Sequence, residues 1–158
     1  MEIEDFTWEV VNGRATILKY KFSHDQVVDD IVIPTFIAGF PVTKIAGLAF
    51  RGNKLRVVVI PIGVTTIGDE AFAWNRLTHI TIPASITIIG DGAFGNNLLE
   101  EVNVPEGVKY IGKNAFIENR LRKVGLPSTV RRIGEGAFDG NDLLNKNIAR
   151  GRENDGKR

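Results

Sequence analysis

Few residues of this chain are suited to acid–base or nucleophilic chemistry. Among its 158 residues there are two histidines, His24 and His79, and no cysteine. Nucleophilic catalysis needs a hydroxyl or thiol held against a base, and no serine recurs at the positions from which His79 would draw a partner. A hydrolase that uses His79 and Glu101 stays as an alternative hypothesis. The residue inventory itself predicts a protein without catalytic activity.

Two further motifs suggest ligands when they are taken alone. Residues 90–95 fit the dinucleotide-binding pattern G-x-G-x-x-G, but that pattern binds phosphate where a helix begins directly after it, and here the next predicted strand is only a few residues away. Asp69, Glu70 and Asp91 have oxygens that suit calcium, yet Lys113 stands where the next acid would be. Without cysteine there are no thiolate zinc sites or iron–sulfur clusters. We expect no cofactor and no metal.

Both motifs belong to a repeat of 22 residues. The dipeptide Ala-Phe recurs at this interval, and columns of isoleucine, asparagine and leucine keep the same register, giving five units. Each unit reads roughly Pro-x-x-Val-x-x-Ile-Gly-x-x-Ala-Phe-x-x-Asn-x-Leu-x-x-Val-x-Ile. A period of this length indicates a solenoid, in which each unit buries its apolar side against its neighbours. The phenylalanine column is Phe50, Phe72, Phe94, Phe116 and Phe138, and the asparagine column is Asn53, Asn75, Asn97, Asn119 and Asn141.

Each unit contains two strand-like segments. In residues 77–82 apolar side chains alternate around Thr81 until Pro83, which lacks an N–H group and ends the pairing. Residues 86–89 contribute further inward side chains before Gly90, where we expect a bend that needs a permissive backbone. Equivalent strands would stack into a parallel sheet. The phenylalanines are expected to form a core spine, and the asparagines to satisfy polar groups of a buried turn.

The chain is predicted to form one domain with three parts. Residues 1–30 form an N-terminal cap, because two alternating segments flank Asn12-Gly13, a strong hairpin signal. Residues 31–144 hold the five repeats, the first with an insertion of five residues at about 36–41. Residues 145–158 form a polar, basic tail. The hairpin side chains expected on one face are Phe6, Trp8, Val10, Leu18, Tyr20 and Phe22.

The units at 82–94 and 104–116 resemble the BspA-like, or Treponema-type, leucine-rich repeats, as does the segment 40–45. The similarity covers about residues 28–144, and the N-terminal hairpin is similar to the opening cap of that family. The family often has cysteine at the asparagine column of this chain. The resemblance implies a mainly β repeat solenoid, a right-handed leucine-rich-repeat-type stack with a parallel sheet. It also implies a non-catalytic bacterial surface or secreted protein that binds host or neighbouring-cell proteins.

The sequence says little about location. Acidic residues follow Met1, opposite in charge to the start of a signal peptide. The longest apolar run, 57–60, is far shorter than the roughly 20 residues that cross a bilayer. We expect no secretion signal in this chain and no membrane insertion, so the extracellular location implied by the resemblance stays open.

The predicted binding surface consists of variable outward positions beside the buried columns, because solenoids present an extended face to partners. Charge is uneven along the chain: residues 1–105 carry 8 Lys/Arg and 12 Asp/Glu, whereas residues 106–158 carry 12 and 7. The total of +1 therefore conceals a basic C-terminal part that would attract an anionic partner. The residues predicted to bind a partner are Val57, Val59, His79, Thr81, Glu101, Asn103, Arg122, Lys123, Arg131 and Arg132.

Together these features predict a non-enzymatic, adhesin-like interaction module that binds a protein or an anionic glycan through contacts on several repeats. Nucleic acid is not expected, because no aromatic stacking platform accompanies the basic residues. The alternative is a structural spacer or stacking unit of a longer repeat protein, which would associate end to end.

Overall fold

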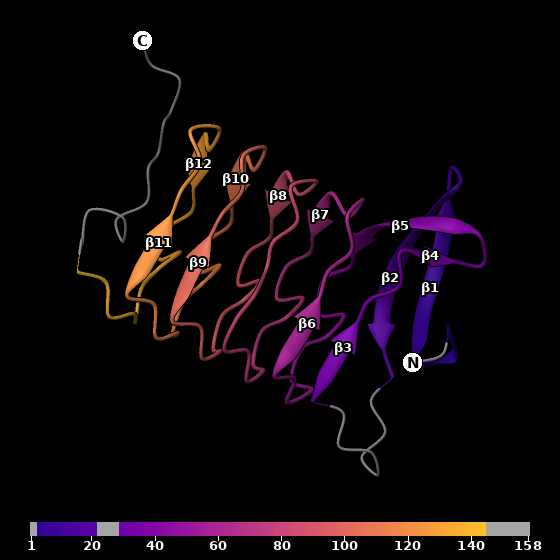
Figure 1. Ribbon diagram of the computed structural model, residues 1–158, viewed down its shortest axis with the longest axis horizontal. Helices are drawn as coiled ribbons and strands as arrows, with labels where there is room; N and C mark the ends of the chain where they lie inside the picture. The colour runs from indigo at the N-terminus through magenta and orange to yellow at the C-terminus, as the bar shows by residue number, and fades with distance from the viewer. Residues whose placement is uncertain (1–2, 22–28, 145–158) are drawn as a thin grey trace.

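The computed structural model describes residues 3–21 and 29–144, which form a single stack of coil turns (Figure 1). Phe22, His24 and the predicted tail at 145–158 lie outside the described residues. The regular secondary structure of the described part consists of short β-strands joined by turns, with one short 3-10 helix, η1 (Ile3–Asp5). The strands are β1 (Phe6–Val11), β2 (Arg14–Tyr20), β3 (Asp30–Val32), β4 (Phe36–Ile37), β5 (Phe40–Ile45), β6 (Val57–Val59), β7 (Thr66–Ile67), β8 (Ile88–Ile89), β9 (Glu101–Asn103), β10 (Tyr110–Ile111), β11 (Lys123–Gly125) and β12 (Arg132–Ile133).

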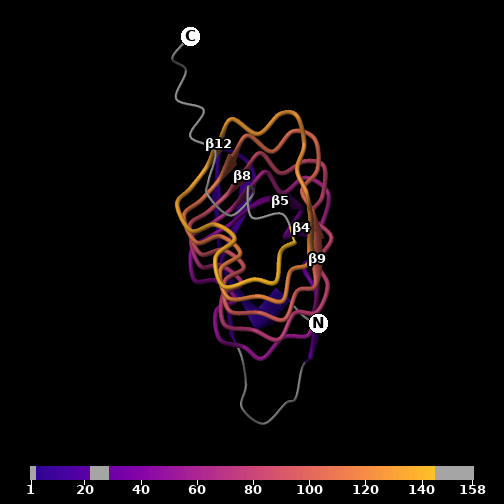
Figure 2. The same ribbon diagram turned by 90° about the vertical axis from the view of Figure 1, so that its left-hand side faces the viewer.

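The strands lie on two sides of the coil. On the first side, called here the back sheet, β2, β5, β7, β8, β10 and β12 pair in parallel, and β1 joins β2 antiparallel. On the second side, the front sheet, β3 pairs with β6 and β9 pairs with β11, all in parallel. Figure 2 shows β8 and β12 on one side of the coil and β9 on the other. The predicted repeat solenoid with a parallel sheet is therefore confirmed.

The N-terminal hairpin of β1 and β2 turns at Asn12-Gly13, as predicted. Strand β2 carries a bulge opposite the step from Thr7 to Trp8: Thr7 pairs with Lys19 and Trp8 with Ile17, which leaves Leu18 as the extra residue. As a result Ile17 and Tyr20 enter the core, whereas Leu18 is 38% exposed. The prediction that Leu18 faces the core is wrong, because Leu18 is itself the extra residue of the bulge, which interrupts the alternation along β2.

The insertion in the first repeat forms a second hairpin. Strand β4 and the start of β5 pair antiparallel around Ala38 and Gly39, whose φ angles are 50° and 84°. Phe36 and Phe40 lie on this hairpin and are 59% and 38% exposed. Ile37 of the same hairpin is fully buried, so the insertion adds both core and exposed apolar surface.

The phenylalanine column forms the predicted spine. Its five rings stack with centroids 5.1–5.5 Å apart and ring planes within 12° of one another, and each side chain is at most 1% exposed. Tyr20 continues the stack beyond Phe50 at 5.8 Å, and Phe6 meets both rings. Burial, together with the negative charge of Asp5, raises the pKa of Tyr20 above its usual value of 10.0.

The asparagine column joins each coil turn to the one before it. The Nδ2 group of Asn97 donates to the carbonyl oxygens of Phe94 and Phe72, both at 3.0 Å, and its Oδ1 accepts from the N–H of Leu77 at 3.1 Å. Asn75 and Asn119 repeat the pattern. The predicted structural role of the asparagines is confirmed, since one amide pairs groups of two turns that would otherwise be buried without partners.

The glycine after each back-sheet strand is required for a different reason from the one predicted. A Cβ atom placed on Gly90 would lie 2.7 Å from the backbone nitrogen of Asp69 in the preceding turn, and Gly68, Gly112 and Gly134 meet the same obstacle. None of these four glycines has a positive φ. The predicted need for a permissive bend is wrong: the successive turns approach too closely for any side chain.

Candidate interaction surfaces

The outward side chains of the front sheet form one exposed row. Val57 and Val59 on β6 are 45% and 48% exposed. Farther along the stack, Lys123 on β11 lies in register with Glu101 on β9. The structure thus brings seven of the ten predicted partner-binding residues to one face, all of them exposed: Val57, Val59, His79, Thr81, Glu101, Asn103 and Lys123.

The front sheet is interrupted in the middle of this row. Residues 77–82 do not form the predicted strand, and within the described residues no backbone hydrogen bond joins 79–81 to β6 or β9. The inward side chain here is Ile80, which is half-buried, whereas Val58 and Val102 at the same position are buried. An isoleucine at this position is not by itself the cause, since Ile31 lies in register with Val58 in β3 and is fully buried.

A hollow of about 400 Å³ opens at this interruption. Residues 79–82 line one side, and Glu101, Asn103 and Pro105 line the other. The Nδ1 atom of His79 lies 3.0 Å from the hydroxyl of Thr78, and both side chains reach solvent. His79 and Glu101 therefore share a hollow that offers imidazole, carboxylate, hydroxyl and amide groups, a mixture suited to binding polar groups of a partner.

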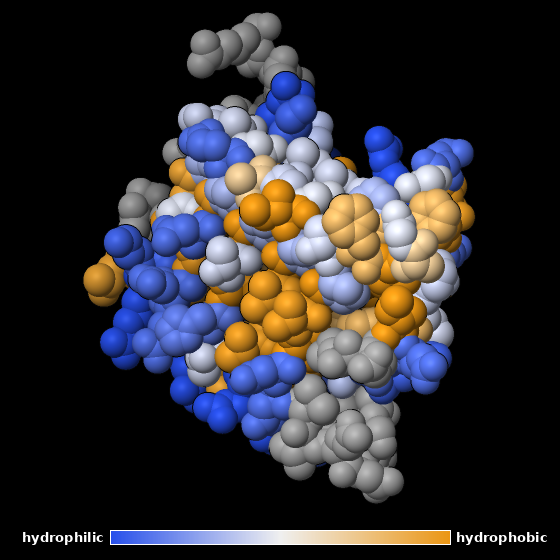
Figure 3. Space-filling view, turned by 45° about the vertical axis from the view of Figure 1, so that its right-hand side comes forward, coloured by the Kyte–Doolittle hydropathy of each residue, from blue (hydrophilic) through white to orange (hydrophobic). Residues whose placement is uncertain are grey.

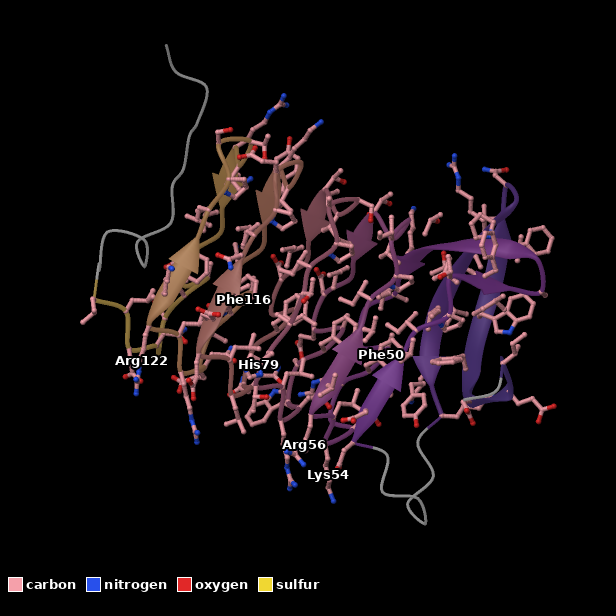
Figure 4. The ribbon with its side chains drawn as sticks, viewed as in Figure 1. Phe50, Lys54, Arg56, His79, Phe116 and Arg122 are labelled. Atoms are coloured by element: carbon pink, nitrogen blue, oxygen red, sulfur yellow. The ribbon has the colours of Figure 1, made fainter. Side chains whose placement is uncertain are left out.

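The three remaining predicted residues lie elsewhere. Arg132 belongs to β12 of the back sheet, in register with Tyr110, and Arg131 precedes it. Arg122 lies at the lower edge of the coil, defined here as the turns that lead from each asparagine to the front strand. Figure 4 shows the Arg122 side chain pointing away from the stack. With Lys123 on the front sheet, the four basic residues predicted to bind a partner are thus divided among three surfaces.

Val32 is a member of the front row that sequence reasoning missed. It lies in register with Val59 and is 62% exposed. Val32, Val57 and Val59 together form the apolar patch of this face, and Figure 3 shows apolar side chains gathered on this side of the molecule. The motif 31–34 repeats the strand-then-proline pattern of the other units. That signal was hidden because Pro34 and Pro61 are 27 residues apart rather than 22.

Two acidic residues of the repeats, Asp69 and Asp91, accept hydrogen bonds from the backbone of the next turn. The Oδ1 atom of Asp69 accepts from the N–H of Asp91 at 2.8 Å, and Asp91 accepts in the same way from Lys113. These contacts border a second hollow of about 480 Å³ on the back sheet, which follows the glycine column past Tyr110 and Arg132. Among residues 3–21 and 29–144, no three His, Asp or Glu side chains are grouped as metal ligands would be.

The structure also bears on the glycine-rich motif and on membrane-spanning segments. The segment 90–95 leads into a turn and not into a helix, so it lacks the context of a dinucleotide site. In the part of the chain that the structure describes, no helix has the length and apolar character needed to cross a bilayer.

Comparison with known proteins adds a family description and several folds. The description "BspA type Leucine rich repeat region" matches residues 15–145 with six copies, one more than the 22-residue period identifies, starting inside β2. A leucine-rich repeat protein from Bacteroides capillosus has a TM-score of 0.69 and 24% identity, over 81% of this chain and 98% of that chain. The T. pallidum leucine rich repeat protein has a TM-score of 0.61 and 23% identity, over 89% of this chain and 88% of that chain.

A leucine rich cell surface protein from Faecalibacterium prausnitzii gives a TM-score of 0.55 and 23% identity, over 89% of this chain and 54% of that chain. No curated protein matches the sequence. At these identities the three structures are similar to this chain in fold.

Proposed function

Because the chain belongs to the BspA type leucine-rich repeat family, we propose that it is a non-enzymatic interaction module whose front sheet binds a protein partner. The observation that carries this proposal is the exposed front row, in which apolar, polar and charged side chains follow one another along a rigid stack. The inward side chains behind β6 and β9, Val58 and Val102, are at most 5% exposed. Since the scaffold is already ordered, binding requires little loss of conformational entropy.

The chemistry of the front row changes along its length. The apolar patch of Val32, Val57 and Val59 suits the desolvated centre of an interface. The hollow beside His79 and Glu101 suits hydrogen-bonding groups, which would form the polar rim. A complementary partner would therefore place apolar side chains over β3 and β6 and polar side chains over the hollow.

The biological setting is part of the same proposal. The Faecalibacterium prausnitzii protein of similar fold is described as a cell surface protein, and the family resemblance implies partners on host or neighbouring cells. We propose an adhesin-like role at a bacterial surface or in a secreted protein, with a protein as the partner.

An array of purified extracellular proteins, probed with the labelled chain, tests the proposal when each hit is retested by interferometry. Val59→Glu and Glu101→Lys on the front row should each weaken a genuine hit at least tenfold. The control pair Arg131→Glu and Arg132→Glu on the back sheet should change it less than threefold, and circular dichroism verifies that all variants fold. Hits that both front-row variants bind as tightly as the parent would contradict the front sheet as the binding face. Sedimentation at rising concentration tests the alternative, in which chains stack end to end.

A further inference from the structure

Cationic side chains gather along the lower edge of the coil from repeats that are distant in sequence. Figure 4 shows Lys54, Arg56 and Arg122 directed away from the stack at this edge. The N–H of Arg76 donates to the carbonyl oxygen of Leu55, and that of Arg120 donates to Leu99, so equivalent positions stack turn upon turn. The cationic edge consists of five exposed residues: Lys54, Arg56, Arg76, Arg120 and Arg122.

Described carboxylates neutralise little of this edge. Among residues 3–21 and 29–144, the single ion pair of the edge joins Arg56 to Asp29 at 3.9 Å. Glu100 and Asp142 are the acidic residues that share the edge positions. Cations held close together without matched anions create a positive potential that attracts a negatively charged ligand. Because the whole chain carries +1, this potential is a local property of the edge.

The charges are arranged for an extended ligand. Lys54 and Arg120 occupy the same position three turns apart, about 16 Å by the ring-to-ring steps of 5.1, 5.4 and 5.3 Å in the spine. Lys54, Arg56 and Arg76 form one cluster, and Arg120 and Arg122 form the other. Between the two clusters lies a turn with Leu98 and Glu100. A compact anion such as phosphate would reach one cluster. A linear ligand with negative groups at intervals would reach both.

Trp74 lies in the turn just before Arg76 and its indole is 56% exposed. Its φ of 59° belongs to this position of the repeat, because Gly52, Asn96, Glu118 and Gly140 also have positive φ in the other turns. The exposed indole is what distinguishes Trp74 from these residues. The core gains little from it, and its flat apolar face is available to a ligand.

We propose that the cationic edge, with Trp74, binds a linear acidic polysaccharide that lies along the stack. Such a chain alternates sulfate or carboxylate groups with the apolar faces of sugar rings, which match arginine and lysine on one hand and a flat, amphipathic indole on the other. Single-stranded nucleic acid fits less well, because its bases stack on successive aromatic residues, whereas Trp74 is the one aromatic residue named at this edge. This proposal uses a different surface from the front sheet and does not depend on it.

Fluorescence anisotropy of a labelled heparin oligosaccharide, titrated with the full chain at several salt concentrations, tests the proposal. The pair Lys54→Glu and Arg76→Glu, and the pair Arg120→Glu and Arg122→Glu, should each lower the affinity at least tenfold. Trp74→Gly, which suits the local φ, should lower it several-fold, and indole fluorescence should change on binding. The matched control is Arg131→Glu with Arg132→Glu, an equal charge change on the back sheet. This pair should lower the affinity less than threefold.

Equal losses in the edge pairs and the back-sheet pair would overturn the proposal, since binding would then follow net charge alone. It would also be overturned if oligo(dT) or poly-glutamate bound more tightly than the saccharide, or if heparin did not bind at low salt. A hyaluronan oligosaccharide distinguishes carboxylate from sulfate as the recognised group. Val59→Glu should leave heparin binding unchanged, so failure of the front-sheet proposal and failure of this one are separable.

Discussion

The front and back sheets are built by the same repeats, yet the back sheet is continuous from β2 to β12 and the front sheet is broken at 79–81. In the back sheet, threonine hydroxyls add to the ladder: the Oγ1 atoms of Thr65 and Thr87 donate to the carbonyls of Thr43 and Thr65. The front row instead varies from valine to histidine, glutamate and lysine. The comparison suggests that the back sheet holds the turns in register, which leaves the front sheet free to carry binding residues.

The largest expected effect comes from the spine that supports both sheets. Phe94→Ala should lower the free energy of unfolding by about 3–5 kcal/mol, because it removes a fully buried ring and leaves a cavity between two stacked neighbours. Urea unfolding followed by circular dichroism measures this loss. A change below about 1 kcal/mol would mean that the spine does not hold the sheets together.

Glycine substitutions should have a smaller effect on stability, and this effect should differ between the two sheets. Gly90→Ala on the back side should cost about 1–3 kcal/mol, because the new methyl group meets backbone atoms of the preceding turn that cannot move aside. Gly125→Ala on the front side is the matched control, since its Cβ would meet mainly the movable amide of Asn103. The free energy of unfolding of this control should stay within about 0.5 kcal/mol of that of the parent. Equal costs in the same urea experiment would contradict the assignment of tight stacking to the back sheet.

The break in the front sheet should persist when Ile80 is replaced. Because Ile31 is fully buried at the same position and its strand pairs with β6, Ile80→Val should leave amide exchange at 79–81 fast. The free energy of unfolding should fall by no more than about 1.5 kcal/mol. Slower exchange at 79–81 in the variant would show that the size of the side chain at position 80 causes the break.

The smallest expected effect concerns pH. The pKa of Tyr20 is raised in the folded chain by burial and by Asp5, so folding favours the protonated phenol. This contribution is fully present below the unfolded pKa of about 10 and is lost as pH rises above it. Stability should therefore fall more steeply above pH 10 in the parent than in Tyr20→Phe. Parallel pH profiles of the two proteins would argue against a buried Tyr20.

Sequence reasoning succeeded where identical columns determine the structure. The period placed Phe94 in the spine and Asn97 in a structural turn, because stacking copies brings equal residues together. It failed at 79–81, where alternation alone predicted a strand that the chain does not form. It also missed Val32, whose repeat has a different length from the others.

The arginines show a further limit of sequence reasoning. The prediction grouped Arg122 with Arg131 by their proximity in sequence, whereas a solenoid groups residues by their position in the turn, which places Arg122 in the column of Arg56 and separates it from Arg131. The cationic edge could have been found by aligning the repeats and comparing columns at the turn after each asparagine.

Hydrogen–deuterium exchange of the free chain tests the difference between the two sheets most directly. The account predicts strong protection for the back-sheet amides of β8 and β10, and exchange at 79–81 close to that of an unpaired segment. Equal protection of 79–81 and β8 would contradict it, because the front sheet would then be as continuous as the back sheet.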